Sequence, residues 1–505
     1  MVKSREDMYA DVNTLMENIR KTNRKVSFNL EDVEDYKVNP DAKPGDLDAK
    51  TPWRIKDLYP KIDDYKLIPT KLYTSPEVME EEWENLWTKT WLLAGRVQDV
   101  KEVGDWFKFD IGRESIVIVR SSKDKISAFY NACTHRGNQL VWEDCGKGTK
   151  SFVCNYHSWM FTLEGKNARV TDRETFDEAV LCDGIDLLNV HTHVWAGFVF
   201  IHMGEEPIPF EEYIGEDLLK FMNVYNFEDM HIVNEVEFTL PANWKVSSDA
   251  FQEVYHLHQT HPQALLASDE TKVQMDFFKN GHNRIIQKKG AVSPRQAKNF
   301  SDTVNEALRY YLEEAGIDPE TYDGDPTDIR EVSIKAKREK MPYGIDYSKL
   351  ADCQLADTIN VTFFPNVTFT VWSEGLFIQR FRPHPTDPNQ SVYDAISIVP
   401  KIKEGVTRPF YYQSVMDVFA ADDISGETRP EKKYTTFENP QCSFFIEQDF
   451  VQIAANHRGL KSRGVRGVIR LSEQERRIQQ FYNEHDLYLK GEKFKPAVSK
   501  ETIKK

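Results

Sequence analysis

The stretch "CTHRGNQLVWEDCGKGTKSFVCNYHSWMF", residues 133–161, contains two short arms, each with one cysteine and one histidine. The first arm holds Cys133 and His135, and the second holds Cys154 and His157. Thiolate sulfur and imidazole nitrogen are both ligands for transition metals. The stretch therefore predicts a metal centre that two loops build together.

Three kinds of site could explain these arms. Cysteine and histidine also pack in protein cores, but chance packing rarely gives both arms in so short a window. Structural zinc sites usually use like ligands in pairs. Here each arm mixes the two types, which suits a 2Fe-2S cluster with two thiolates on one iron and two imidazoles on the other. We favour the cluster, because each loop then supplies one ligand to each iron.

Residues near the arms have expected roles of their own. Glycines would let the loops bend around the cluster, at Gly137, Gly146 and Gly148. Aromatic side chains could shield it, at Tyr156, Trp159 and Phe161. Lys147 and Lys150 could dock an acidic electron donor, although solvated loop lysines are the simpler interpretation.

Length and composition limit the class of protein. The chain has 505 residues, 40% of them hydrophobic, which predicts two or three packed domains. The net charge of −16 argues against nucleic acid or an anionic membrane as the main partner. The start of the chain lacks a signal-peptide core, and the apolar run at 194–203 is too short to span a bilayer. Six cysteines are too few for a disulfide framework, so we expect a cytoplasmic protein.

Hydrophobic patterns divide the chain into four parts and predict an α+β fold. We expect a charged extension over 1–66, a small all-β domain over 67–205, a second domain over 206–490 with a charged insert at 290–350, and a basic tail over 491–505. Helices are predicted at 8–21, 75–91, 209–222, 244–259, 301–316, 442–457 and 472–489.

A second group of acids and histidines lies in "NWKVSSDAFQEVYHLHQTHPQ", residues 243–263. If this segment is helical, then Asp249, Glu253 and His256 lie close together beside an apolar stripe. Buried acids are costly unless they bind a metal or another partner. An exposed polar face is the alternative. His261 falls off this helical register, so a bend or helix end is expected there.

The motif "CTHRG…CNYHSW" resembles the Rieske signature of the catalytic α subunits of ring-hydroxylating (Rieske non-heme iron) oxygenases. The upstream stretch "WTKTWLLAGRVQDVKEVGDWFKFDIGRESIVIVR", residues 87–120, resembles the same family. The resemblance covers roughly residues 67–490. It implies a Rieske 2Fe-2S domain followed by a helix-grip domain, an antiparallel sheet wrapped on a long helix, which binds a mononuclear Fe(II).

The same resemblance implies roles in the second group. His256 and His261 are the expected iron ligands, and His258 is not expected to be one. Glu253 matches the acid that bridges the cluster of one subunit to the iron of its neighbour. Asp249 matches a position near the iron.

The third iron ligand should be a distant carboxylate. The stretch "FFIEQDFVQIAANHRGLKSRG" offers Glu447 and Asp449 in an apolar helical run. The downstream "NHRGLKSRG" resembles the family's segment after its ligand, and that register selects Asp449. A surface carboxylate is the alternative.

The resemblance implies a terminal oxygenase that uses O2 and electrons from a separate reductase or ferredoxin, since no nucleotide-binding loop is visible. The electron route would run from His135 or His157 of one subunit through Glu253 to His256 of the next. A homotrimer or hexamer, with a possible small β subunit, is expected. The insert at 290–350 is expected to cap the pocket or to serve oligomer contacts.

Apolar stretches at 360–372 and 444–445 favour a small apolar substrate, aromatic or hydroaromatic, that is mono- or cis-dihydroxylated. The alternatives are an O- or N-demethylating Rieske monooxygenase, an electron-transfer Rieske protein without a second iron, and a zinc-stabilised scaffold.

Overall fold

The computed structural model describes residues 13–21, 28–34, 67–300, 302–405 and 429–493. By their internal contacts these residues form two compact units. The smaller unit contains Pro76–Tyr213 and Arg382–Asp387 with the described residues from Leu487, and the larger contains Ile214–Phe381 and Pro388–Asp486 with the described residues up to Ser75. The mixture of helices and antiparallel sheets confirms the predicted α+β class. The predicted domain boundaries stay a prediction, and most of the expected extension and tail lies outside the described residues.

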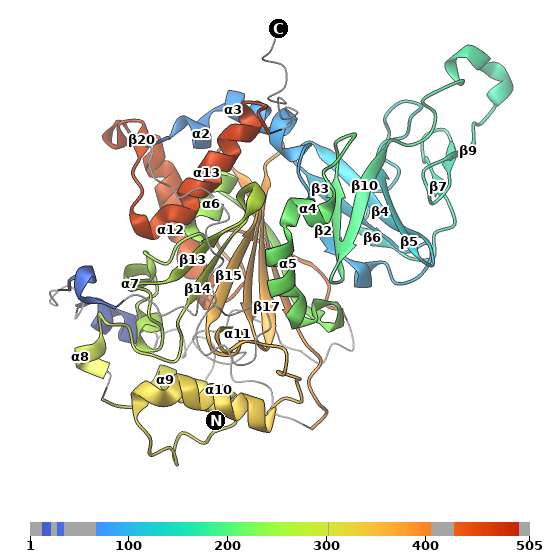
Figure 1. Ribbon diagram of the computed structural model, residues 1–505. Helices are drawn as coiled ribbons and strands as arrows, with labels where there is room; N and C mark the ends of the chain where they lie inside the picture. The colour runs from blue at the N-terminus through green and yellow to red at the C-terminus, as the bar shows by residue number, and fades with distance from the viewer. Residues whose placement is uncertain (1–12, 22–27, 35–66, 301, 406–428, 494–505) are drawn as a thin grey trace, which may run out of the picture. The chain divides into compact units, whose positions relative to one another are not determined.

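The smaller unit is built on antiparallel strands (Figure 1). Its main sheet has the order β2 (Leu92–Arg96), β11 (Phe198–His202), β10 (Asn189–Trp195), β5 (Lys125–Tyr130), β4 (Glu114–Ser122), β3 (Trp106–Ile111) and β6 (Cys145–Gly146). A second sheet joins β7 (Phe152–Val153), β8 (Met160–Phe161) and β9 (Asn167–Arg169). The middle of strand β4, residues 116–119, is buried on both faces, which explains its continuous apolar run.

Two predicted helices are interrupted. The helix expected at 75–91 is α3 (Pro76–Glu82), which continues as a π-helix over Trp83–Trp87. The helix expected at 209–222 is split into α4 (Phe210–Ile214) and α5 (Glu216–Met222). Gly215 lies between them with φ of 91°, a backbone conformation that glycine adopts without strain.

The larger unit has one extended sheet. Its order is β13 (Gln274–Phe277), β14 (Asn283–Gln287), β15 (Thr358–Phe363), β16 (Val367–Trp372), β17 (Gly375–Pro383), β18 (Ser391–Val399), β12 (His231–Leu240) and β19 (Lys433–Tyr434). Strand β19 joins β12 in parallel, and the other registered pairs are antiparallel. A short pair, β1 (Ile68–Pro69) and β20 (Val468–Ile469), also belongs to this unit.

The long helix α12 (Phe444–Leu460) packs against this sheet. Its side chain Phe450 contacts Phe238 of β12 and Tyr393 of β18, with ring centroids 5.1 and 4.9 Å apart. The helix begins after Ser443, whose hydroxyl accepts a hydrogen bond from the Ile446 N–H. A long helix against an antiparallel sheet is the arrangement that the helix-grip prediction requires.

The prediction of one helix over 244–259 is wrong. The chain forms α6 (Trp244–Ala250), leaves the helical path, and resumes as the short α7 (Leu257–Thr260). In between, the Glu253 carboxylate accepts a hydrogen bond from the backbone N–H of His256 at 3.1 Å. A side chain that binds nearby backbone competes with helical hydrogen bonding. The expected helix end before His261 is present, because α7 stops at Thr260.

Further helices complete the larger unit: α2 (Lys71–Thr74), α8 (Ala297–Phe300), α9 (Glu306–Glu314), α10 (Ile329–Lys340), α11 (Asp352–Ala356) and α13 (Arg476–Leu489). Residues 13–21 are also helical. Helices α9 and α10 of the predicted insert lie side by side (Figure 1), joined by a hydrogen bond from the Ser333 hydroxyl to the Tyr311 carbonyl.

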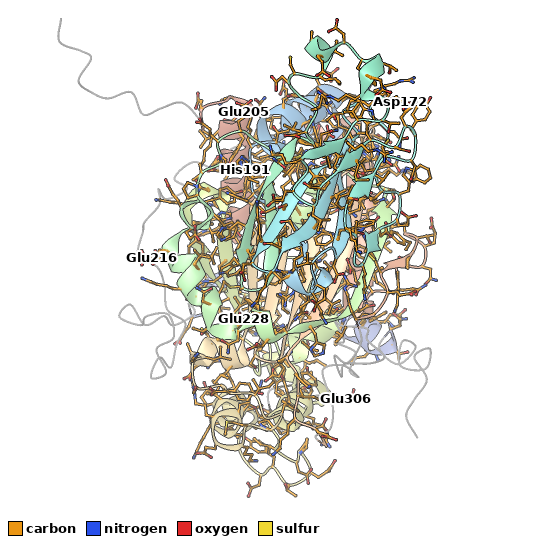
Figure 2. All side chains as sticks on the ribbon, turned by 90° about the vertical axis from the view of Figure 1, so that its right-hand side faces the viewer. Asp172, His191, Glu205, Glu216, Glu228 and Glu306 are labelled. Atoms are coloured by element: carbon orange, nitrogen blue, oxygen red, sulfur yellow. The ribbon has the colours of Figure 1, made fainter. Side chains whose placement is uncertain are left out.

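The outer surface of the larger unit carries acidic side chains, among them the exposed Glu216 and Glu228 (Figure 2). They contribute to the net charge of −16. Among the helices of the described residues, none has both the length and the apolar character needed to cross a bilayer.

Candidate metal centres and substrate cavity

The two cysteine arms of the smaller unit form loops with the same hydrogen-bond pattern. In the first, the Cys133 N–H donates to the Asn138 carbonyl at 2.8 Å, and the Gly137 N–H donates to the Cys133 carbonyl at 2.8 Å. Gly137 has φ of 78°. The loop therefore turns back on itself immediately after the cysteine and the histidine.

The second loop repeats this geometry. The Cys154 N–H donates to the Trp159 carbonyl at 2.8 Å, and the Ser158 N–H donates to the Cys154 carbonyl at 2.9 Å. Ser158 has φ of 59°, the same left-handed backbone region that the first loop fills with glycine. Two matching loops thus present one cysteine and one histidine each.

The two loops bring their cysteines together and their histidines together. Cys133 and Cys154 are buried, and the rings of His135 and His157 lie with centroids 4.6 Å apart. Trp159 stacks on His135 at 4.9 Å. This donor set of two thiols and two imidazoles fits a Rieske cluster.

The electrostatics of the two thiols differ. Burial raises the pKa of Cys133 to about 11. Burial acts the same way on Cys154, but hydrogen bonds with the N–H groups of Tyr156 and His157 and with the side chains of Cys133 and Asn138 together outweigh it, and they hold the pKa of that thiol below its ordinary value. Backbone N–H groups directed at sulfur are one means by which proteins tune cluster potentials.

The predicted surroundings are partly as expected. Trp159 and Phe161 are buried next to the loops, whereas Tyr156 is 59% exposed, although its ring lies 3.8 Å from the ring of His157. Lys147 and Lys150 are both exposed. Their proposed docking role stays a prediction.

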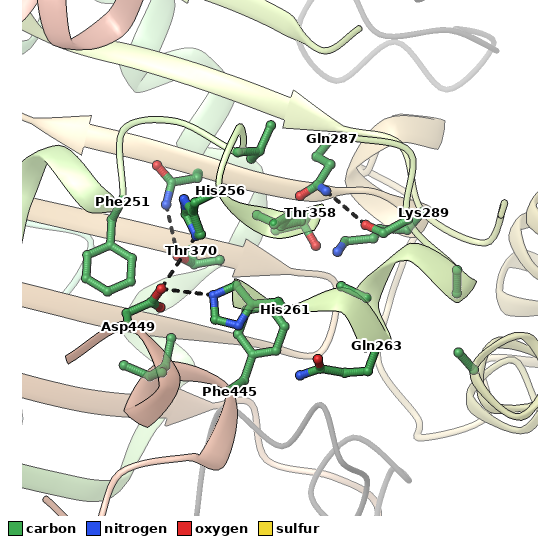
Figure 3. A pocket seen from close by; sticks show the side chains of 18 of the residues that line it. Phe251, His256, His261, Gln263, Gln287, Lys289, Thr358, Thr370, Phe445 and Asp449 are labelled. Carbon is green, nitrogen blue, oxygen red and sulfur yellow. Dashed lines mark hydrogen bonds and ion pairs between the residues drawn. The ribbon is translucent and has the colours of Figure 1, made fainter. Parts of the chain in front are cut away.

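The larger unit brings together His256, His261 and Asp449 (Figure 3), although Asp449 comes from the distant helix α12. One ligand atom from each residue lies within 4.8 Å of the other two. The Asp449 Oδ1 lies 2.9 Å from His261 Nε2 and 3.5 Å from His256 Nε2. Two imidazoles and a carboxylate converging in this way form the set that binds non-heme Fe(II).

Outer groups fix the orientation of both imidazole rings. His256 Nδ1 lies 2.6 Å from Glu253 Oε1, and His261 Nδ1 lies 2.8 Å from the amide oxygen of Gln448. The Gln263 side-chain amide also donates to that Gln448 oxygen, at 2.8 Å. With each Nδ1 engaged, each Nε2 is left to bind a metal, an arrangement typical of histidine ligands in metalloproteins.

The charges around His256 favour a positive group. Burial opposes protonation of this ring, but the carboxylates of Glu253 and Asp449 outweigh burial and raise the pKa of His256 to about 9. A divalent cation would satisfy the same two carboxylates.

The other candidates lie outside this group. Glu447 and His258 are not members of the three-residue set. The Asp249 carboxylate accepts hydrogen bonds from the hydroxyls of Tyr73 at 2.7 Å and Tyr482 at 3.2 Å. Burial raises the pKa of Asp249 to about 7.

A cavity of about 310 Å³ adjoins the three-residue set. Alternate residues of neighbouring strands form one wall, because successive side chains of a strand point to opposite faces. That wall contains Ile285, Gln287, Thr358, Asn360, Thr370, Trp372, Phe377 and Gln379. Other lining residues lie close in sequence to the three-residue set: Phe251, Val254, Leu257, Phe445 and Ile446.

The predicted pocket stretches contribute fewer aromatic residues than expected. From 360–372, the lining residues are Asn360, Thr370 and Trp372, whereas Phe363 and Phe369 pack on each other in the core. Phe445 does line the cavity and stacks on His261 at 3.9 Å. The expected contribution of the insert is partly visible, since Tyr310 and Tyr311 of α9 also line the cavity.

Sequence reasoning missed several residues that shape the site. Gln448 and Gln263 escaped notice because neither type is a usual iron ligand. Lys289 was missed as well, although it lines the cavity and is only 6% exposed. A lysine two residues after Gln287, in phase with a buried strand, was the available signal.

Two protein-family models match the chain. The Rieske 2Fe-2S domain matches residues 90–180, and the catalytic domain of ring-hydroxylating α subunits matches residues 227–491. Together they cover the two candidate metal centres described above. The two expected cofactors, a Rieske cluster and a mononuclear iron, are those of this family.

Curated relatives are named as monooxygenases of quaternary ammonium compounds. The chain is 30% identical over 245 residues to the carnitine monooxygenase oxygenase subunit of Escherichia coli, which is 48% of this chain and 63% of that protein. It is 27% identical over 269 residues to the chloroplastic choline monooxygenase of Amaranthus tricolor, covering 51% and 58% of the two chains. The chain thus spans less than two thirds of the length of these relatives.

Solved structures share the fold. The quaternary ammonium Rieske monooxygenase CntA, in complex with an inhibitor, has a TM-score of 0.59 at 20% identity, covering 84% of this chain and 96% of that chain. A naphthalene 1,2-dioxygenase with indole bound has a TM-score of 0.58 at 17% identity, covering 84% and 92%. Fold alone therefore does not separate the two substrate classes. The names of the sequence relatives do not support the predicted aromatic substrate and favour the monooxygenase alternative.

Proposed function

This chain belongs to the family of ring-hydroxylating α subunits with a Rieske domain, and we propose that it is a terminal oxygenase that monooxygenates a methylated ammonium compound. The observation that carries the proposal is the convergence of His256, His261 and Asp449 beside a cavity of about 310 Å³. An electron carrier without a second iron would have no need of that set or of that cavity.

The residues of the site have distinct proposed roles. His256, His261 and Asp449 hold the iron, and Glu253 and Gln448 orient the two imidazoles. When bound, Fe(II) in such a set supplies the binding and activation of O2. In the overall reaction one oxygen atom enters a C–H bond of the substrate, and two electrons and two protons convert the other to water.

The cavity suits a methylated ammonium group near the metal. The side chain of Phe251 lies beside Asp449 (Figure 3), and Phe445 covers His261. Aromatic faces attract cations that cannot donate hydrogen bonds, and quaternary ammonium groups are frequent ligands of such faces. The aromatic side chains could therefore bind a methylated ammonium group as well as they could bind an apolar ring.

Electrons must come from outside this site. We propose that they pass from the Rieske cluster of a neighbouring copy through Glu253 to His256, in a homotrimer or larger ring. A separate reductase or ferredoxin would reduce the cluster.

A single-turnover experiment tests this function without knowledge of the reductase. Dithionite-reduced, iron-loaded protein is mixed with O2 and one compound, and mass spectrometry measures substrate loss and product. L-carnitine, γ-butyrobetaine, glycine betaine and choline form one group, and naphthalene and indole form the other. We expect turnover within the first group and none in the Asp449→Ala variant. Turnover of the aromatic group alone would contradict the proposal.

A further inference from the structure

Lys289 presents a buried cation to the cavity. It follows β14, where Ile285, Gln287 and Lys289 alternate along one face and all line the cavity. Its residue is 6% exposed. In Figure 3 the ammonium group points into the cavity, toward the space beside Thr358. The side chain therefore belongs to the substrate space and not to the outer surface.

Within the part of the chain that the structure describes, the Lys289 ammonium makes no hydrogen bond or ion pair. Its backbone N–H donates to Asp357 Oδ1 at 3.1 Å. That carboxylate is already engaged by the Arg330 guanidinium, at 2.9 and 2.8 Å. An ammonium group that is largely shielded from water and has no partner costs free energy. A partner that enters from outside would remove this cost.

Two hydroxyl groups beside Lys289 are free to donate. Ser268 Oγ accepts a hydrogen bond from the Gln287 amide at 2.9 Å, and Thr358 Oγ1 accepts one from Trp372 Nε1 at 3.1 Å. Each hydroxyl therefore still has its own hydrogen to offer. Gln287 and Thr358 are paired in the register of β14 and β15, which keeps this group together.

We infer that Lys289, Ser268 and Thr358 bind a carboxylate of the substrate. This inference rests on the proposed function and narrows its substrate class to small zwitterions. The methylated ammonium group would lie among the aromatic side chains near the metal ligands, and the carboxylate would lie at Lys289. An ionised carboxylate only accepts hydrogen bonds, through two oxygens. The Lys289 ammonium and the hydroxyls of Ser268 and Thr358 can supply the donors that it needs.

The inference divides the compounds in the relatives' names into those with a carboxylate and those without one. Carnitine and glycine betaine carry a carboxylate, whereas choline carries only a hydroxyl group. A cation without an anionic group would meet the charge of Lys289 with no compensation. We therefore expect carboxylated compounds to bind and choline to bind poorly.

Calorimetric titration of the anaerobic, iron-loaded full chain tests the inference. The probes are γ-butyrobetaine, its methyl ester, which keeps the trimethylammonium group but lacks the negative charge, and butyrate, which keeps only the carboxylate. Because a hydrogen bond to a charged group contributes roughly 1.5–3 kcal/mol, we expect γ-butyrobetaine to bind the wild-type chain about 10–100-fold more tightly than the ester.

Substitutions identify the residue responsible. Lys289→Met should reduce the affinity for γ-butyrobetaine by about 10–100-fold and leave that for the ester unchanged or increased. Lys288→Met is the matched control, since the neighbouring residue points to the other face of the strand. Lys289→Arg should retain part of the affinity. The Rieske absorbance and iron content of each variant show that it is folded.

The outcomes separate this inference from the proposed function. Equal binding of γ-butyrobetaine and its ester, unaffected by Lys289→Met, would overturn the carboxylate site while leaving the ammonium substrate in place. Binding of butyrate that depends on Lys289, with no contribution from the ammonium group, would support the carboxylate site and contradict the proposed function. No binding of any probe would overturn both.

Discussion

Glu253 Oε1 lies 2.6 Å from Nδ1 of His256, and the other carboxylate oxygen of Glu253 accepts the backbone N–H of the same histidine at 3.1 Å. One side chain thus fixes both the ring and the backbone of an iron-ligand candidate. The same contact interrupts the helix that the sequence predicts. The side chain that interrupts the helix is therefore also the side chain that orients the His256 ring.

Glu253→Gln should leave both metal centres in place and slow the transfer of electrons between them. The amide keeps the size of the side chain but removes the charge that faces His256. In the presence of substrate, O2 should reoxidise the reduced cluster about 10–100-fold more slowly than in the wild type. Losses of this size are typical when a residue that hydrogen-bonds a metal ligand is changed. Stopped-flow absorbance of the cluster measures this rate, and a normal rate would exclude Glu253 from the route.

Asp449→Ala should remove the mononuclear iron without disturbing the cluster. The carboxylate is the one negative ligand of the predicted set, so its loss leaves two neutral imidazoles. We expect iron content to fall from about three to about two atoms per chain, with sulfide unchanged. Glu447→Ala, two residues earlier on the same helix, is the matched control and should keep all of its iron.

Asp249→Asn should change how stability depends on pH. Burial raises the pKa of this carboxyl to about 7, above its unfolded value, so the folded chain holds a proton that the unfolded chain releases. Stability should therefore fall as pH rises from about 4 to about 7, by a few kcal/mol at most, and stay level above that. The amide variant should lack this contribution. Urea unfolding of both proteins at pH 5 and pH 8 tests it, and identical pH dependence would contradict the expected titration.

The affinity for carboxylated substrates should decline above about pH 8. Burial lowers the pKa of Lys289 to about 8, while the carboxylates of Asp357 and Glu270 act in the opposite direction. Arg330 pairs with Asp357 and Arg295 pairs with Glu270, and among the described residues neither acid forms an ion pair with the ammonium group. Above this pH the lysine is neutral, and the dissociation constant of γ-butyrobetaine should rise by up to about tenfold per pH unit.

Lys289→Arg provides the control for that pH profile, because a guanidinium stays charged throughout. Its affinity for γ-butyrobetaine should be level up to about pH 10. The methyl ester should show no decline in either protein. A wild-type profile as level as that of the arginine variant would contradict the role of Lys289.

The candidate cluster site could be located in the sequence because all four of its proposed ligands lie in two short arms. Hydrogen bonds between near neighbours shape the loops that carry Cys133 and Cys154, so residues that are close in the sequence are also close in space. The iron site is harder to predict, since Asp449 comes from a helix almost two hundred residues away and only the family resemblance selected it over Glu447.

The substrate cavity could not be predicted in the same way. The carboxylate-binding group draws Ser268, Lys289 and Thr358 from separate segments that meet only through strand pairing. The aromatic residues that suggested an apolar substrate, such as Phe363 and Phe369, belong to the core. Composition counts aromatic residues but does not say which face of a strand they occupy.

Electron paramagnetic resonance of the dithionite-reduced chain, with and without nitric oxide, tests the central claim most directly. The account predicts a Rieske-type signal together with a high-spin ferrous–nitrosyl signal, and γ-butyrobetaine should perturb the second signal and not the first. The nitrosyl signal should be absent in Asp449→Ala and retained in Glu447→Ala. A Rieske signal with no nitrosyl signal, in iron-reconstituted wild-type protein, would contradict the assignment of an oxygenase site to His256, His261 and Asp449.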